Sequence, residues 1–365
     1  MAERDPHLKR RQALSRKFRN AGIDGLLVSG TENVRYLSGF RGEDSVLLVT
    51  RDDAALITDG RYVEQAGSET TGLEIFVRKK ALMPAAARQA RRMEIGRLGV
   101  EAGAVTLGQY EALRDAAKRI ELVSTAGLVE RLRMIKDRDE IRAIERAVAV
   151  AEEAFRAVTG QLRPGMTERE VALSLDRTME DLGAEGPAFP TIVAAGKRSS
   201  LPHAVPTDRR IRRGDAVLVD WGARVDGYHS DLTRMLFLAR IPPIFRRMFP
   251  LVQGAQRRAL TQMRPGRPLR QPDSSARAHF KAHRHNKYFT HGLGHGLGLM
   301  IHEAPILASR SDQTLKPGMV CTVEPGLYRP GRGGVRIEDD VLITRTGHRV
   351  LTTLPKSLES FLLSP

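Results

Sequence analysis

Apolar residues recur along the chain with two different spacings, which predict helices in some stretches and strands in others. Between Lys9 and Gly22 they fit an amphipathic helix, whereas SVLLVT and AALITDG read as short strands between polar turns. This mixture predicts an α/β domain at the amino terminus. From Leu132 to Ala151 helical spacing returns, which predicts a connector and a long helix. We therefore expect two domains, residues 1–125 and 126–365.

The second domain contains a predicted β-hairpin. Two apolar runs, Ala216–Trp221 and Leu232–Leu238, flank Asp226-Gly227, a pair typical of two-residue hairpin turns. Such a turn predicts that Val225 pairs with Tyr228. This pairing sets the register of every residue farther along the two strands.

Two acids fall on one face of this hairpin. Asp220 is expected opposite Thr233, with Asp231 diagonally across, and Thr233 could hydrogen-bond a ligand carboxylate. Two solvated acids on a surface hairpin are the alternative, because aspartate is mostly exposed. The continuous apolar run at 217–219 weakens this alternative, since an acid that ends a strand buried on both sides needs a partner.

A short pattern occurs twice in this domain. Arg-Pro-Gly at 163–165 is followed by Gly214 and, six residues later, by Asp220; Arg-Pro-Gly at 264–266 is followed by Gly318 and, six residues later, by Glu324. Each copy continues into a strand with another acid, Asp231 or Glu338. The repeat predicts two helix-plus-hairpin units around a pseudo-two-fold axis, with the four acids converging at its centre. Chance similarity is the alternative.

Three histidines lie in one glycine-rich run, HGLGHGLGLMIH. Its glycines make a helix improbable, and in an extended strand His291 and His295 point to the same side. His302 closes the run, and no HExxH helix follows because Pro305 stops it. His203 lies in a proline-flanked loop where structural and functional roles are equally open.

The acids and His295 together have the chemistry of a metal site. Asp220, Asp231, Glu324 and Glu338 offer four carboxylates, which suit two divalent cations better than one structural zinc. Arg336 is expected on the same strand face as Glu338, where it could hold a ligand carboxylate or a substrate anion. Cys321 points to the face opposite Glu324 and is expected in the core.

Three runs carry a family resemblance. VLVDWGARVDGYHSDLTR, HGLGHGLGLMIHEAP and EPGLYRPGRGGVRIEDDVLIT resemble the metal-binding signature of the proline-specific members of the methionine-aminopeptidase-like metallopeptidases, Xaa-Pro aminopeptidase and Xaa-Pro dipeptidase (prolidase). YLSGFRGEDSVLLVTRDDAALITDGRYVEQA is similar to their creatinase-type amino-terminal domain. The resemblance implies a small α/β domain followed by a pita-bread catalytic domain, an α+β fold with pseudo-two-fold symmetry.

The resemblance also implies roles for single residues. Asp220 and Asp231 would bind one ion, Asp231 and Glu338 would bridge the two ions, and His295 and Glu324 would complete the other. Glu324 would also carry the proton in metal-assisted hydrolysis. The residues that match the family's active-site histidines, and the arginine beside its bridging glutamate, are His203, His291, His302 and Arg336.

We expect a manganese enzyme, with cobalt or zinc as alternatives, that forms a homodimer and acts on proline-containing peptides. Proline needs a dedicated peptidase, because its imide nitrogen lacks the N–H by which an extended substrate is held. The YLSGF and DGRYVEQA runs favour the aminopeptidase, with the dipeptidase as the alternative.

Composition adds a compartment and a competing hypothesis. One cysteine, the lack of an apolar run of membrane length and the polar start of the chain predict a cytoplasmic protein without a membrane segment. The formal net charge of +16 makes a nucleic-acid- or ribosome-associated role the hypothesis from another class. We expect the excess to be spread along the chain, and no binding module accompanies it.

One segment departs from the family pattern. Residues 267–288 hold prolines at the start and arginine and histidine later, where a regular amphipathic helix is expected. A helix beginning after Asp273 as N-cap, with Ala276, Phe280 and His283 on one side, is the prediction for this segment.

Overall fold

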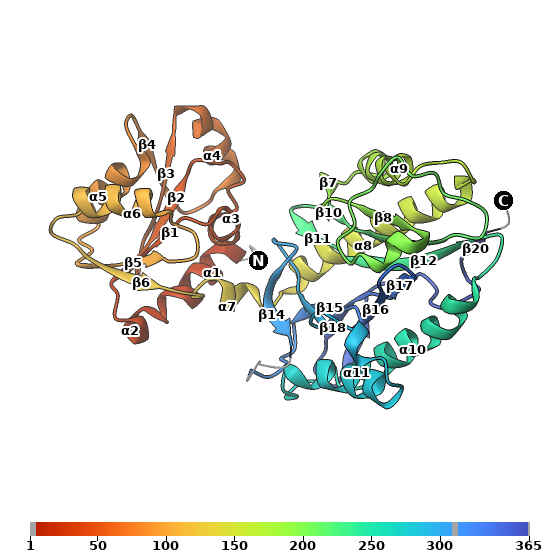
Figure 1. The fold of residues 1–365 in the computed structure, drawn as a ribbon. Coiled ribbons are helices and arrows are strands. Elements are labelled where there is room, and N and C mark those ends of the chain that lie inside the picture. Colours follow the sequence, from red (N-terminus) through yellow and green to blue (C-terminus); the bar gives the residue numbers. More distant parts are fainter. Residues whose placement is uncertain (1–4, 309–312, 364–365) are drawn as a thin grey trace. The chain divides into compact units, whose positions relative to one another are not determined.

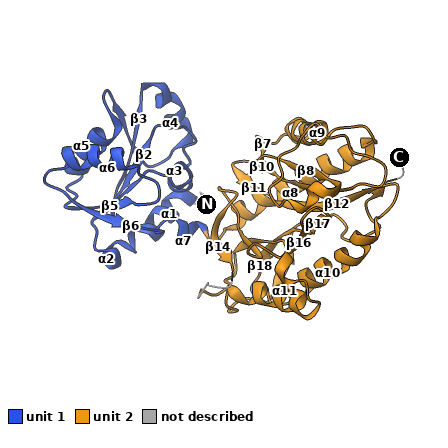
Figure 2. Cartoon of the chain, viewed as in Figure 1, with its two compact units in different colours: residues 1–133 blue, residues 134–365 orange. Residues whose placement is uncertain are grey.

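A computed structural model describes residues 5–308 and 313–363 of the chain, which divides into two compact units, residues 1–133 and 134–365 (Figures 1 and 2). The predicted boundary after Thr125 coincides with the end of the last strand of unit 1 and stays a prediction. No helix among the described residues combines the length and the apolar character needed to cross a bilayer.

Unit 1 is built on one six-stranded sheet. The strand order is β4-β3-β2-β1-β5-β6, and β2 runs antiparallel to both of its neighbours while the remaining pairs are parallel. The elements are α1 (Pro6–Ser15), α2 (Phe18–Ala21), β1 (Gly25–Val28), α3 (Thr31–Ser38), β2 (Val46–Val49), β3 (Ala54–Asp59), η1 (Gly60–Tyr62), α4 (Val63–Glu69), β4 (Glu74–Arg78), α5 (Leu82–Arg92), β5 (Arg97–Glu101), α6 (Leu107–Ala116), β6 (Glu121–Thr125) and α7 (Glu130–Arg133).

The first helix of unit 1 is shorter than predicted. The Lys17 N–H bonds to Leu14 O at 2.9 Å, so the chain tightens there, and α1 and α2 replace the single helix expected from Lys9 to Gly22. Gly22, with φ 66°, then ends α2. The prediction of one continuous helix was wrong because hydrophobic spacing does not report such a local break.

Unit 2 contains two larger sheets, a small three-stranded sheet and a two-stranded ribbon. The larger sheets have the orders β20-β12-β9-β8 and β14-β13-β15-β18-β19. The elements are α8 (Arg138–Gln161), α9 (Glu168–Asp181), β7 (Gly186–Pro187), β8 (Ile192–Ala195), η2 (Gly196–Ser200), β9 (Ala216–Trp221), β10 (Ala223–Val225), β11 (Tyr228–His229), β12 (Leu232–Leu238), α10 (Pro243–Leu260), α11 (Arg270–Ala282), η3 (Asn286–Tyr288), β13 (Gly294–Gly296), β14 (Glu303–Leu307), β15 (Val320–Val323), β16 (Gly326–Arg329), β17 (Gly333–Arg336), β18 (Asp339–Ile343), β19 (His348–Val350) and β20 (Leu362–Leu363).

The helices of unit 2 cover the sheets from two sides. Val217 and Val219 of β9 belong to a core cluster with α8 and α9, whereas Ala216 and Leu218 belong to a cluster with α10 and α11. The central strand is therefore buried on both faces, as its continuous apolar run predicted. The predicted long helix is confirmed as α8, which begins with a capping box between Asp137 and Glu140. Cys321 lies in the core as predicted.

The two Arg-Pro-Gly segments make the same turn. Gly165 N–H donates to Ile211 O and Gly266 N–H donates to Leu315 O, each at 2.8 Å, and both glycines have positive φ, 100° and 81°. The matching bonds of the second glycine pair are Gly214 N to Leu238 O at 2.6 Å and Gly318 N to Ile343 O at 2.9 Å. Matched bonds at matched positions support a repeated unit rather than chance similarity.

The start of α11 differs from the prediction. The helix begins at Arg270, so Asp273 lies inside its first turn and is not the N-cap. Asp273 is buried, accepts hydrogen bonds from Arg277 Nε at 2.9 Å and from Leu293 N at 3.1 Å, and so serves a tertiary contact. Ala276 and Phe280 are buried, but His283, expected on the same side, is the exposed C-cap residue of α11.

Candidate metal centre

The β9–β12 hairpin has the predicted register. Val225 pairs with Tyr228, and Thr233 pairs with Asp220. Asp226 and Gly227 both have positive φ, 49° and 72°, as a two-residue hairpin turn of the primed type requires.

The hairpin bends just beyond Asp220 and just before Asp231. At Gly222 a Cβ atom would lie 1.9 Å from Ser230 O, so only glycine fits there. Ser230 Oγ also accepts from Ala223 N at 3.0 Å, and the strands beyond the bend join a different sheet. The two acids therefore flank the bend, and both are buried.

The second repeated unit contacts the first at Thr233. Glu338 N donates to Thr233 O at 3.3 Å, and Thr233 Oγ1 donates to Glu338 Oε2 at 2.5 Å. The predicted hydrogen bond from Thr233 to a candidate ligand is therefore present. These bonds join the two repeated units at the centre of unit 2 and bring Glu338 toward Asp231.

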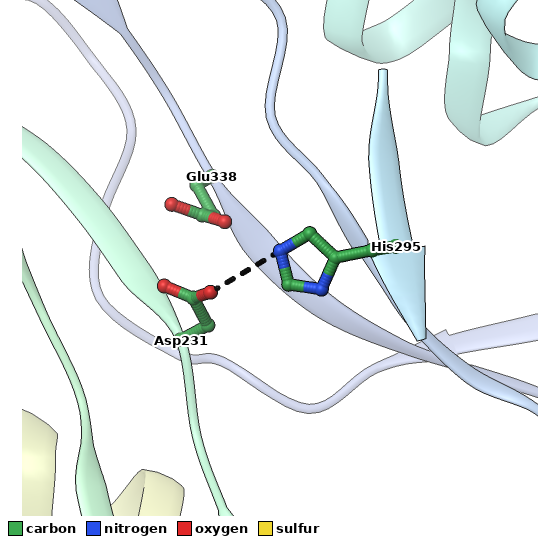
Figure 3. Close-up of side chains that lie close together, drawn as sticks. All are labelled: Asp231, His295 and Glu338. Carbon is green, nitrogen blue, oxygen red and sulfur yellow. Dashed lines mark ion pairs between the residues drawn. The ribbon is translucent and has the colours of Figure 1, made fainter. Parts of the chain in front are cut away.

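Asp231, His295 and Glu338 form a compact cluster (Figure 3). One potential ligand atom from each residue lies within 4.8 Å of the others. His295 Nε2 lies 3.6 Å from Asp231 Oδ2 and 3.5 Å from Glu324 Oε1. The cluster thus joins the residue before β12, a residue of β13 and the residue before β18, with Glu324 adjacent.

His295 is held in the form that a metal ligand needs. Its Nδ1 lies 3.0 Å from Gly296 O, and a proton on Nδ1 leaves the Nε2 lone pair facing the carboxylates. Burial lowers the pKa of His295 to about 4, so the ring is neutral at pH 7.

The carboxylates of this centre are protonated more easily than ordinary acids. Burial raises the pKa of Glu324 to about 8, and burial together with the neighbouring carboxylates raises the pKa values of Asp231 and Glu338 well above their usual range. The pKa of Asp220 is also raised by burial, while Arg336 opposes the rise. Four acids share this space with one arginine, so cations would stabilise their ionised forms.

An unpaired oxygen provides a separate test of whether cations fit. Among the described residues, Asp220 Oδ1 is buried and has no hydrogen-bond partner. Its other oxygen, Oδ2, accepts from Arg336 Nη2 at 2.5 Å. A buried carboxylate oxygen that faces other carboxylates without a donor suits a divalent cation.

Arg336 connects the ligand acids to the surrounding residues. Its Nε donates to Thr233 Oγ1 at 2.9 Å, and its Nη1 donates to Tyr328 OH at 2.9 Å. The side chain is buried, so Arg336 is not a surface arginine. The neighbouring acids raise the pKa of Arg336 against the effect of burial, which lowers it.

The three remaining histidines occupy different positions around the cluster. His291 is partly buried, with Nε2 3.0 Å from Tyr328 OH and Nδ1 3.8 Å from Glu324 Oε2. His302 is exposed, and its ring centroid lies 4.4 Å from that of His295. His203 is also exposed, and its charge opposes the burial-induced rise in the pKa of Asp220. His203 and His302 can therefore meet a ligand from solvent.

Two residues of this centre were missed by the sequence analysis. Tyr328 joins His291 to Arg336, and burial raises its pKa to about 12, so it stays a hydroxyl donor. Asp340 is buried and accepts from Asp231 N at 3.0 Å. Strand alternation could have indicated Asp340, which follows Glu338 by two residues, but not Tyr328, which lies on β16 whereas Glu324 follows the end of β15.

Comparison with known proteins gives two family matches. Metallopeptidase family M24 matches residues 142–345, and the creatinase/prolidase N-terminal domain matches residues 10–135. Together they cover both compact units and confirm the predicted creatinase-type domain and pita-bread catalytic domain.

Individual relatives extend over nearly the whole chain. The Xaa-Pro dipeptidase of Pyrococcus furiosus is 37% identical over 92% of this chain and 95% of its own. A solved Xaa-Pro dipeptidase from Bacillus anthracis is 40% identical with a TM-score of 0.94, covering 96% of this chain and 99% of its own. A solved X-Pro aminopeptidase from Thermotoga maritima is 36% identical with a TM-score of 0.87, covering 94% and 99%. The chain belongs to metallopeptidase family M24.

Proposed function

We propose that this metallopeptidase is an Xaa-Pro dipeptidase, which hydrolyses the bond before proline in a dipeptide. The observation that carries the proposal is the cluster of Asp231, His295 and Glu338 at the junction of the two repeated units. Relatives of both names match, but the structure with the higher TM-score and the Pyrococcus relative are dipeptidases. The aminopeptidase, which the sequence alone favours, is therefore the second candidate.

We propose two divalent ions, manganese first, held by Asp220, Asp231, His295, Glu324 and Glu338. Support comes from the charge of the centre, because three buried carboxylates and the half-buried Glu324 share it with one arginine and one neutral imidazole. A single dication would leave an excess of negative charge in a site of low dielectric. Bound ions would supply Lewis acidity toward the scissile carbonyl and lower the pKa of a water.

Glu324 is proposed to move the proton. Its Oε1 faces His295 and its Oε2 faces His291 Nδ1, so the carboxylate lies between the ligand cluster and the substrate side. A carboxylate in this position can accept a proton from the attacking water and deliver it to the imide nitrogen of the leaving proline. The departing amine needs this proton, because an unprotonated nitrogen would leave as an unstable amide anion.

The remaining polar residues are proposed to orient the substrate. Arg336 holds Asp220 in place, and Tyr328 holds Arg336 and His291 together through its hydroxyl group. His203 and His302 are exposed beside the centre and can donate to the scissile carbonyl oxygen or to the proline carboxylate. These roles use donors whose geometry exists before substrate arrives.

The test compares a Xaa-Pro dipeptide with a Xaa-Pro-Xaa tripeptide, using purified protein loaded separately with manganese, cobalt or zinc. Cleavage of the dipeptide alone supports the dipeptidase. Release of the first residue from the tripeptide at a similar rate supports the aminopeptidase instead. Cleavage of neither substrate contradicts both functions, provided that metal analysis shows bound ions.

The oligomeric state and the compartment stay predictions. A homodimer is tested by sedimentation of the metal-loaded protein, and a monomer at micromolar concentration would contradict it. A cytoplasmic location is tested by cell fractionation.

A further inference from the structure

The positive charge of the chain is concentrated in one segment. Residues 240–287 contain twelve Lys and Arg but one acid, Asp273, so they carry +11 of the total formal charge of +16. The rest of the chain has 47 basic and 42 acidic residues and is nearly balanced. The expectation that the excess is spread along the chain was therefore wrong.

Most of this segment forms α10 and α11, which pack against each other within unit 2 (Figure 2). Their apolar residues, such as Phe249, Val252 and Phe280, lie in the core. Arg246, Arg247, Arg257 and Arg258 of α10 are exposed on its other side. The two arginine pairs are eleven residues apart, which is about three helical turns, so they lie about 16 Å apart on one face.

α11 and its C-cap place two histidines beside the same face. The two helices approach closely at Gly254, where a Cβ atom would lie 2.7 Å from His279 Nε2. The His279 ring lies 4.5 Å from the His283 ring between centroids. The pKa of His279 is lowered by burial and further by the positive charges of His283, Arg258 and Arg257. We call Arg246, Arg247, Arg257, Arg258, His279 and His283 the basic face.

Within residues 5–308 and 313–363, the arginines of the basic face are not neutralised by an acid. Among the described residues, no carboxylate forms an ion pair with Arg246, Arg247, Arg257 or Arg258. Asp273, the single acid of the segment, is buried and is already paired with Arg277. The face therefore attracts anions from solvent.

The surroundings of these arginines indicate the kind of anion. No large hydrophobic side chain of residues 240–287, all of which are described, is exposed, so the face lacks the apolar anchors of protein interfaces and of membrane-surface helices. Guanidinium groups bind phosphate through paired hydrogen bonds and need no apolar contact. Phosphates repeated along a strand match the two separated arginine pairs.

We propose that the basic face binds the phosphate backbone of nucleic acid, without reading base sequence. Affinity comes from several phosphate contacts and from released counter-ions, so it depends strongly on salt. The absence of exposed aromatic side chains on these helices leaves no stacking platform for bases, which is why sequence plays no part. The face is distinct from the metal centre and does not depend on its proposed chemistry.

The test measures fluorescence anisotropy of a labelled mixed-sequence oligonucleotide of about 20 nucleotides, with full-length protein, across a salt series. The test variant reverses four charges, R246E, R247E, R257E and R258E. The control reverses four exposed charges of unit 1, K79E, K80E, K118E and R119E, and so has the same net charge. A polyglutamate peptide serves as a competitor without phosphate.

We expect the test variant to bind at least about tenfold more weakly with a shallower salt slope, and the control to change by less than about twofold. Equal weakening of both variants would overturn the proposal, since net charge alone would explain it. Polyglutamate that competes as well as unlabelled oligonucleotide, or no binding by the unmodified protein at about 0.1 M salt, would also overturn it. Dipeptide hydrolysis and unchanged melting temperature verify folding, and binding can be measured even if hydrolysis is absent.

Discussion

The two repeated units of the catalytic domain have the same turns and central acids, but their outer helices differ in charge. Both turn at a glycine with positive φ, make matching backbone bonds and contribute two candidate ligand carboxylates to the centre. Their outer helices differ in charge, since α8 and α9 hold six basic and ten acidic residues whereas α10 and α11 hold seven and one. The shared fold needs the turns and the central acids, but it does not set the charge of the helices that cover it.

The most direct test of whether both repeated units supply metal ligands replaces one acid from each of them. We expect Asp231→Asn and Glu338→Gln each to lower kcat/KM by more than the about 10–100-fold typical of residues that only support metal ligands. The physical reason is that each carboxylate lies in the same compact cluster with His295. Steady-state kinetics and metal content by mass spectrometry measure the effect. A variant that keeps both its metal content and its activity would exclude that residue as a ligand.

The hydrogen bond between Thr233 and Glu338, which joins the two repeated units, should be nearly as important for activity as the acids themselves. Thr233→Val keeps the shape of the side chain but removes the donor to Glu338 and the acceptor for Arg336 Nε. We expect kcat/KM to fall by about 10–100-fold and the free energy of unfolding to fall by about 1–3 kcal/mol, because buried polar groups lose their partner. Thr178→Val is the control, since that hydroxyl bonds only within α9, to Ser174 O. Equal activity losses in the two variants would mean that the junction has no special role.

Removing the metal should reveal the repulsion between the acids of the two units. Glu324, with a pKa raised to about 8, and Asp231 and Glu338, with pKa values raised well above their usual range, hold protons that the unfolded chain releases near pH 4. The stability they contribute is therefore fully present below about pH 4 and is lost as pH rises toward 8 and beyond. We expect the melting temperature of chelator-treated protein to fall by about 5 °C between about pH 5 and 8.

Manganese should cancel this fall, because ions that bind only the folded state stabilise it. Glu338→Gln, which removes one of the acids, should flatten the profile of the chelator-treated protein. Differential scanning fluorimetry measures both effects. A melting temperature that rises over this pH range would show that the acids are ionised and paired in the absence of metal.

Substitutions in the two Arg-Pro-Gly turns should have the smallest effects, and the two effects should be equal. Gly165→Ala and Gly266→Ala each place a side chain at positive φ, where no atom lies within 4 Å of the new Cβ. Only backbone strain remains, so each should lower the free energy of unfolding by about 1–2 kcal/mol without changing kcat/KM. Urea unfolding measures the two costs. Costs that differ by more than about 1 kcal/mol would show that the two turns are not equivalent in energy.

Much of the site could be predicted because local patterns control it. The Asp-Gly turn and the apolar runs determine the hairpin register, and the repeated spacing indicates the two units. The start of α11 could not be predicted, because Asp273 bonds to Leu293 rather than capping the helix, and that contact exists only in the folded chain. Tyr328 was missed because its partners, His291 and Arg336, are brought to it by tertiary structure. Substrate length is not encoded in the ligand residues, which the dipeptidase and aminopeptidase readings share.

The junction at Thr233 and Glu338 also bears on how the protein matures in a cell. Each repeated unit brings only some of the candidate ligands, and His295 and Asp231 approach each other across the junction. A chain whose second repeated unit has not yet packed against the first therefore lacks the cluster and cannot retain metal through it. Loading with metal would then act as a checkpoint of synthesis, separating finished molecules from nascent or misassembled ones.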